Sequence, residues 1–319
     1  MRIIPLVSLS MLLSLPANAA KIESVANVGI GPIWSLSADP SGTHILAAGD
    51  DAEVAVLDAE TLTRSQIHRH KRGFHIYSAE FFPDNKRVIS ASFAGSVEIW
   101  DRHTGETLHE LVGHEEYVAR VAVSPVGRTI ATAGADDVVI IWSADTYEPL
   151  YRLHAKSPVG VSFLNECGTR VAVASMDGLQ IWDVSSEQVI KTLDSTYNNL
   201  TATYDPGTET LLSTTMPRDG VLSRVFQLQT NEEVTLEGPA AMYWASSINA
   251  GGKLVAASQY KGSVSIWDRF NGKRIDTIGD AKFQTMSVTF SKTSPNKIFV
   301  GGEDGAIRRY DVSVSAPNH

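Results

Sequence analysis

Seven short markers recur along the chain at a nearly constant spacing, and this period constrains the fold more than any other feature. Each marker is a Trp-Asp pair or a degraded copy of one. The markers lie at Leu57, Trp100, Trp142, Trp182, Phe226, Trp267 and Tyr310. Successive markers are 40 to 44 residues apart. A fixed period of roughly 20–50 residues is typical of repeat architectures, in which each repeat is one supersecondary unit.

Each period has the same internal order. An alternating apolar run, as at residues 118–123, leads into a turn rich in Pro, Gly, Asp and Asn; a strand of small residues follows, as at 254–258. A tight turn, the marker strand and a more polar strand complete the unit. Four strands per period, without helical periodicity, predict an all-β fold, a seven-bladed β-propeller of four-stranded antiparallel blades. We expect the third strands to end near residues 58, 101, 143, 183, 227, 268 and 311.

The last period is one strand short. It contains three strands, over 286–290, 297–301 and 306–310, before the chain stops. The missing fourth strand is predicted at residues 22–28, so that the N-terminal strand completes blade 7 and closes the ring. Closure removes the exposed edge of the sheet. Residues 20–319 are therefore expected to form a single propeller domain.

One period holds a full set of four polar residues that could bond to one another. The set consists of His114, Thr132, Asp136 and Trp142. With the Trp-Asp period, it makes the sequence resemble the WD-repeat (G-protein β-subunit-like) propeller family, as an exported bacterial member. The resemblance implies that the four residues form a buried structural relay of hydrogen bonds. Blade 2 departs from the pattern, because it keeps Ser90 and Trp100 but has Ala94 at the Asp position.

Residues 1–19 have the pattern of a secretory signal peptide. A short positive start precedes an apolar run, and Ala17-Asn18-Ala19 fits the small-residue cleavage rule. The one cysteine, Cys167, cannot form an internal disulfide, which suits a bacterial periplasm. We therefore expect a periplasmic protein that does not insert into the membrane after cleavage, with secretion as the alternative.

The charge of the chain bears on its partners. The formal net charge is −9. An acidic protein of this kind is a poor match for nucleic acid or for an anionic membrane surface. We expect its partner to be another protein or a complex.

Candidate chemistry is sparse in the sequence. His68, His70 and His75 form the densest histidine group. Two His one residue apart on a strand share a face and could bind a metal, but the segment is basic, which favours a solvated outer strand or loop. Cys167 lies in a hairpin turn and is expected at or near the surface. No catalytic residue, metal ligand or cofactor is predicted, and the protein is not expected to be an enzyme.

The first position of each inner strand lies near the mouth of the central channel. Large apolar residues occupy it in four consecutive blades, with Tyr243 beside them. These residues are Trp244, Met286, Trp34 and Tyr77. Such side chains at a rim are good anchors for a partner. Packing between blades is the alternative interpretation.

The sequence therefore predicts a monomeric, non-enzymatic protein-interaction scaffold in the periplasm, an accessory factor of a periplasmic or envelope complex. Two alternatives stay open. One is a propeller hydrolase or lactonase with a metal in the channel. The other is a binder of small ligands or glycans that uses the aromatic residues.

Overall fold

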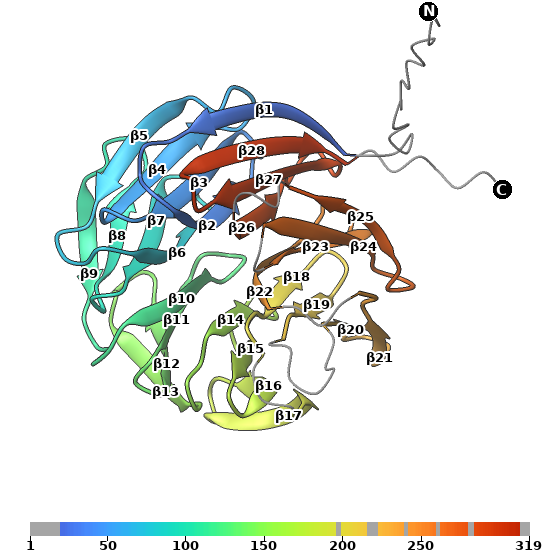
Figure 1. The fold of residues 1–319 in the computed structure, drawn as a ribbon. Coiled ribbons are helices and arrows are strands. Elements are labelled where there is room, and N and C mark those ends of the chain that lie inside the picture. Colours follow the sequence, from blue (N-terminus) through green and yellow to red (C-terminus); the bar gives the residue numbers. More distant parts are fainter. Residues whose placement is uncertain are drawn as a thin grey trace, which may run out of the picture.

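The structure is a computed structural model and describes residues 20–195, 199–215, 223–238, 242–259, 262–279 and 284–312. The described strands form seven four-stranded antiparallel sheets arranged as a ring (Figure 1). The seven-bladed all-β fold predicted from the period is confirmed. The expected signal peptide, residues 1–19, lies outside the described residues.

The strands are grouped here by their position in the blade, starting from the channel. The inner strands are β2 (Ile33–Ala38), β6 (Ile76–Phe81), β10 (Val118–Val123), β14 (Gly160–Phe163), β18 (Thr203–Asp205), β22 (Tyr243–Ile248) and β26 (Thr285–Phe290). The second strands are β3 (His44–Gly49), β7 (Arg87–Ser92), β11 (Thr129–Gly134), β15 (Arg170–Ser175), β19 (Thr210–Ser213), β23 (Leu254–Gln259) and β27 (Lys297–Gly302). The third strands are β4 (Glu53–Asp58), β8 (Val97–Asp101), β12 (Val138–Ser143), β16 (Gly178–Asp183), β20 (Arg224–Gln227), β24 (Ser263–Asp268) and β28 (Ala306–Asp311). The outer strands are β5 (Arg64–Arg69), β9 (Thr107–Leu111), β13 (Pro149–His154), β17 (Gln188–Asp194), β21 (Glu232–Thr235), β25 (Arg274–Ile278) and β1 (Lys21–Asn27).

The core lies between the blades. Every residue of β7 and β11 except the first is buried, whereas most of β17 is exposed. Second and third strands face a neighbouring blade on both sides, which explains their continuous runs of small and apolar residues. The marker residues Trp100, Trp142 and Trp267 are buried in these interfaces, each at the residue before a third strand's last position.

The N-terminal strand closes the ring. β1 pairs antiparallel with β28, and Figure 1 shows the two ends of the described chain side by side in one blade. Arg309 of β28 forms an ion pair with Glu23 of β1 (Nε to Oε2, 2.8 Å). The same guanidinium donates to the carbonyl of Ala59 in blade 1 (3.0 Å), so it ties the closing blade to the first one. The predicted closure is confirmed.

The two faces of the ring are defined by strand direction. We call the face at which the inner strands begin the top face. Because neighbouring strands are antiparallel, the loops that lead into the inner strands and the turns between second and third strands both lie on the top face. The other turns lie on the bottom face. Within the described residues there is no helix that combines the length and apolarity needed to cross a membrane.

Candidate functional site

The four relay residues of blade 3 form one chain of hydrogen bonds. His114 Nδ1 lies 2.9 Å from Asp136 Oδ2, and His114 Nε2 lies 2.7 Å from Thr132 Oγ1. Trp142 Nε1 donates to the same Thr132 hydroxyl (2.9 Å). Because a carboxylate only accepts, His114 donates from Nδ1 and accepts from the Thr132 hydroxyl at Nε2. Burial lowers the pKa of His114, which agrees with a neutral ring.

A glycine makes room for this relay. A Cβ atom on Gly134 would collide with the imidazole of His114 and the carboxylate of Asp136. The backbone of β11 therefore approaches the relay as closely as it does only because residue 134 has no side chain. The relay is part of the blade's framework and holds the loop that leads into β10 against the turn between β11 and β12.

Blade 2 contains a second relay that the sequence did not reveal. His70 Nε2 lies 2.6 Å from Ser90 Oγ, and Trp100 Nε1 donates to the same hydroxyl (3.0 Å). His70 thus occupies the role of His114, and Ser90 that of Thr132. Ala94 cannot supply the carboxylate, and Glu98 of β8 approaches His70 instead (Oε1 to Nδ1, 3.6 Å).

Glu98 is the centre of a buried polar cluster. It accepts hydrogen bonds from His68 Nε2 (3.1 Å), the Lys71 backbone N–H (3.1 Å) and the Thr107 hydroxyl (3.0 Å). The ring of His68 also stacks on Trp100, with centroids 4.7 Å apart. The expected solvated outer strand is wrong for His68 and His70, which are both buried. Both ring nitrogens of His68 have hydrogen-bond partners inside the blade, whereas His70 is bonded through Nε2 and its Nδ1 has none.

The electrostatics of this cluster follow from burial and pairing. Burial lowers the pKa of His70 to about 4, although the charge of Glu98 opposes the shift. The pKa of Glu98 is lowered to about 2, because the hydrogen bond from His68 and the further donors outweigh its desolvation. At neutral pH the cluster therefore holds an ionised carboxylate next to a neutral His70.

The predicted rim residues have different environments. Trp34 and Tyr77 are half-buried on the top face of blades 1 and 2, and Trp244 is exposed on blade 6. Tyr243 and Met286 are buried. Tyr243 packs on Trp267 in the space between blades 5 and 6. For this residue the alternative interpretation, packing between blades, is the one observed.

The predicted partner-binding surface therefore needs correction for these two buried residues. Tyr243 and Met286 offer a partner almost no surface, so they are withdrawn from the candidate site. Met286 is the rim residue predicted for blade 7. Blade 7 lies between blade 6, which carries Trp244, and blade 1, which carries Trp34. The continuous arc over four blades is broken at this point.

A compact group of rings gathers instead over blades 1 to 3. Tyr77 contacts Trp34 (centroids 5.6 Å apart), Phe93 (5.9 Å) and Tyr117 (5.9 Å). Phe93 stacks on Tyr117 (5.3 Å), and His75 lies 6.1 Å from Phe93. We call Trp34, His75, Tyr77, Phe93 and Tyr117 the aromatic patch. All five lie in top-face turns or at the start of an inner strand.

Asp50 fixes one side of the patch. It lies in the turn between β3 and β4 and accepts a hydrogen bond from Trp34 Nε1 (2.6 Å). The same carboxylate oxygen pairs with His75 Nδ1. Burial, together with the nearby Tyr117 and Asp50, raises the pKa of Tyr77. Asp50 thus orients two rings of the patch, so that the surface is pre-formed.

The edge of the patch is apolar and open. Phe93 is 49% exposed, and two further apolar side chains on the top face, Phe74 (77%) and Val112 (80%), extend into solvent. Exposed apolar side chains on one face of a protein are typical of interaction sites. Sequence reasoning missed Phe93 and Tyr117 because it considered one position per blade. The available signal was a large aromatic residue in a hairpin turn, where polar residues are usual.

Two further predictions concern the cysteine and a metal site. Cys167 is exposed, as expected. In the described part of the chain, no group of three His, Cys, Asp or Glu side chains is placed to hold a metal ion.

Comparison with known proteins agrees with this fold. The family profile described as "WD domain, G-beta repeat" matches residues 62–101 and 105–143, which run from β5 to β12. The β-propeller domain of Cps50 (Swd1) from Myceliophteria thermophila superimposes with a TM-score of 0.79 at 18% identity, covering 92% of this chain and 100% of that one. The fold is that of a seven-bladed β-propeller, and two stretches of the chain match the WD-repeat profile.

Curated relatives are similar over parts of their length. Protein tipD of Dictyostelium discoideum is 23% identical over 91% of this chain and 48% of its own length. The small ribosomal subunit protein RACK1y of Oryza sativa subsp. japonica is 30% identical over 33% of this chain and 32% of its own length. The guanine nucleotide-binding protein subunit beta of Lymnaea stagnalis is 26% identical over 46% and 44%, respectively. The matches thus span half or less of each relative.

Proposed function

We propose that this propeller is a non-enzymatic protein-interaction scaffold, exported to the periplasm, that serves as an accessory factor of a periplasmic or envelope complex. Its partner binds the aromatic patch on the top face of blades 1 to 3. The observation that carries the proposal is the contact network of five rings, held by Asp50 at Trp34 and His75 and left open to solvent at Phe93.

The patch has the properties of a binding hot spot. Aromatic side chains bury a large area with few rotatable bonds, and they dominate the energy of many interfaces. A pre-formed patch loses little conformational entropy when a partner binds. The WD-repeat resemblance also favours a protein partner, and two of the relatives are by name subunits of larger assemblies.

The location rests on the sequence of residues 1–19, which has the pattern of a secretory signal peptide. A single cysteine is compatible with an oxidising compartment, because no disulfide is needed to hold a ring that closes through its own strands. Cell fractionation of the native host would test this part: recovery in the periplasmic fraction is expected, and recovery in the cytoplasm would contradict it.

Affinity purification from the native host tests the partner and the surface together. The bait is the full chain, and the variants are Phe93→Ser and Tyr117→Ser. The control is Phe270→Ser, which changes an aromatic residue of similar exposure (63%) in a bottom-face turn. We expect wild type and control to recover one protein in stoichiometric amount.

The patch variants should bind that protein at least about 30-fold more weakly, as is typical of hot-spot aromatic residues. Equal recovery by all four baits would contradict the assignment of the surface. If a wild-type bait recovers no protein but binds glycans in solution, the scaffold function itself is wrong.

A further inference from the structure

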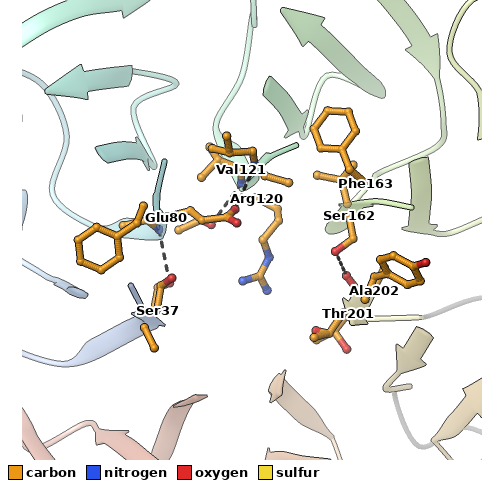
Figure 2. Close-up of a pocket in the computed structure, with 18 of the residues that line it drawn as sticks. Ser37, Glu80, Arg120, Val121, Ser162, Phe163, Thr201 and Ala202 are labelled. Atoms are coloured by element: carbon orange, nitrogen blue, oxygen red, sulfur yellow. Dashed lines mark hydrogen bonds between the residues drawn. The ribbon is translucent and has the colours of Figure 1, made fainter. Parts of the chain in front are cut away.

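The central channel of the ring contains a cavity of about 460 Å³, which the structure leaves open between the inner strands (Figure 2). Its volume lies in the range of small-molecule sites. The cavity wall is formed by inner-strand residues of several blades, and prolines of the bottom-face turns surround it at one end. The aromatic patch is at the top face, so the two features occupy different parts of the propeller.

Arg120 of β10 projects its guanidinium into the middle of this cavity (Figure 2). Among the described residues, no hydrogen bond or ion pair involves the Arg120 guanidinium, and Glu80 is the one carboxyl whose charge influences it. Desolvation inside the ring lowers its pKa, and the charge of Glu80 opposes that shift. Arg120 is partly exposed to the channel, and a partly desolvated guanidinium without an ion-pair partner lacks the counter-charge that such groups usually have.

The ring itself does not need an arginine at this position. Ser35 and Ser78 are at the equivalent place in blades 1 and 2, since each pairs with the same alanine position of its second strand as Arg120 does. Both serines accept a hydrogen bond from the next blade, Ser35 from Ala79 N (3.4 Å) and Ser78 from Val121 N (3.2 Å). Blade 3 therefore has a cation in place of an inter-blade hydrogen bond.

The surroundings of Arg120 favour a single negative charge. Lys292 lines the bottom end of the cavity and adds a second cation. Glu80, the nearby carboxyl, has its pKa raised to about 7 by desolvation, against the hydrogen bond from Val123 N and the charges of Lys292 and Arg120. Near neutral pH, Glu80 is partly protonated and can donate a hydrogen bond. As an anion, it offsets one of the two cations, so that the charges of the lining together neutralise one negative charge rather than two.

Hydroxyl groups line another part of the wall. Ser246 Oγ lies 2.8 Å from both Thr201 Oγ1 and Thr203 Oγ1, which joins the inner edges of blades 5 and 6. Ser246 and Thr203 are partly exposed and line the cavity. Such hydroxyls donate to or accept from polar groups of a ligand.

We propose that the channel binds a small monocarboxylate with polar substituents, whose carboxylate pairs with Arg120 and whose polar groups face the hydroxyls of Thr203 and Ser246. Guanidinium and carboxylate match in a bidentate geometry that is stronger than a neutral hydrogen bond. The proposal does not depend on the proposed function, because the aromatic patch contributes only Trp34, at one end, to the cavity wall.

Calorimetric titration of the purified full chain tests this site. The probes are L-lactate and gluconate at pH 8, with lactamide as the neutral counterpart of lactate and inorganic phosphate, mostly doubly charged at this pH, as the competitor. We expect at least one of the two carboxylates to saturate below about 10 mM, with lactamide and phosphate at least about tenfold weaker. Absence of saturation by both carboxylates, or tighter binding of phosphate, would overturn the proposal.

Three variants locate the binding. Arg120→Gln should weaken the carboxylate at least about tenfold, whereas Arg128→Gln, an exposed arginine of the turn after β10, should change nothing. Because Arg120→Gln changes an inner strand, Lys292→Gln serves as a second variant at an exposed position, with an expected weakening of about two- to fivefold. Wild-type affinity in both the Arg120 and the Lys292 variants would place the anion elsewhere and refute the assignment.

Discussion

At the scale of single residues, blades 2 and 3 use different side chains to bond the indole N–H of the marker tryptophan. Each must satisfy the indole N–H of a buried marker tryptophan. Blade 3 uses Thr132 and His114 backed by Asp136 from a turn, whereas blade 2 uses Ser90 and His70 with Glu98 from a strand. The two blades therefore take the carboxylate from different elements, and in blade 2 Glu98 stays 3.6 Å from His70 Nδ1, beyond hydrogen-bond distance.

The histidine of blade 2 predicts an acid-sensitive fold. The pKa of His70 is about 4 in the folded protein, below its ordinary value of 6.5, so the unfolded chain binds the proton first as pH falls. Stability present above pH 6.5 is therefore lost as pH falls toward 4. Between pH 8 and pH 5 we expect the free energy of unfolding to fall by about 2 kcal/mol because of this residue. Urea denaturation at the two pH values measures it.

The matched variant for this experiment is His70→Gln, which keeps a polar group beside Ser90 but does not titrate. Its free energy of unfolding should be lower than that of wild type at pH 8 and should change less between pH 8 and pH 5. Parallel pH profiles for the two proteins would show that His70 is not the responsible group. Glu98 contributes its own loss only at lower pH, because its pKa is about 2.

Residue-level prediction from sequence succeeded where the spacing was regular. His114, Thr132, Asp136 and Trp142 could be assigned because each occupies its expected place along one blade. His70 could not, because its carboxylate partner, Glu98, comes from a different strand and looks like an ordinary polar residue in an alternating pattern. The basic character of the segment around His68 also suggested solvent exposure, although aromatic stacking on Trp100 buries it.

At the scale of elements, top-face turns of neighbouring blades assemble the aromatic patch. The first positions of inner strands predicted Trp34 and Tyr77, but Phe93 and Tyr117 come from a hairpin turn and a connecting loop. These contacts depend on how adjacent blades are rotated about the channel. The sequence of a single strand does not indicate how neighbouring blades are oriented. For the same reason it did not indicate that Met286 is buried whereas Trp244 is exposed.

The closing strand β1 is the element whose removal should have the largest effect. Deleting residues 20–27 exposes the edge of β28 and removes the Arg309–Glu23 ion pair. We expect a lower melting temperature and association of the truncated protein through the open edge, because an unpaired strand edge recruits other strands. Thermal melting and size-exclusion chromatography measure these two effects.

A synthetic peptide with the sequence of residues 20–28 provides the control. Added in trans, it should pair with β28 and restore part of the melting temperature. A truncated protein that stays monomeric and melts like wild type would show that β1 is not needed for closure.

At the scale of the whole molecule, closure leaves two distinct places for binding. The blades pack on one another around the ring, so the stability of the fold depends on the second and third strands and on the marker tryptophans. The top face carries the aromatic patch, where we propose that a protein partner binds, and the channel holds the polar cavity around Arg120, where we propose that a monocarboxylate binds. The seven blades could be predicted from the spacing of the markers, and their closure from the missing strand of the last period and the candidate strand at residues 22–28.

Hydrogen–deuterium exchange of the propeller with and without its captured partner tests the central claim most directly. The proposal predicts slower exchange in the complex for three top-face segments, residues 72–77, 92–96 and 113–118, with the bottom-face turns unchanged. Protection confined to bottom-face turns such as residues 269–273, with no change around Phe93 and Tyr117, would contradict it.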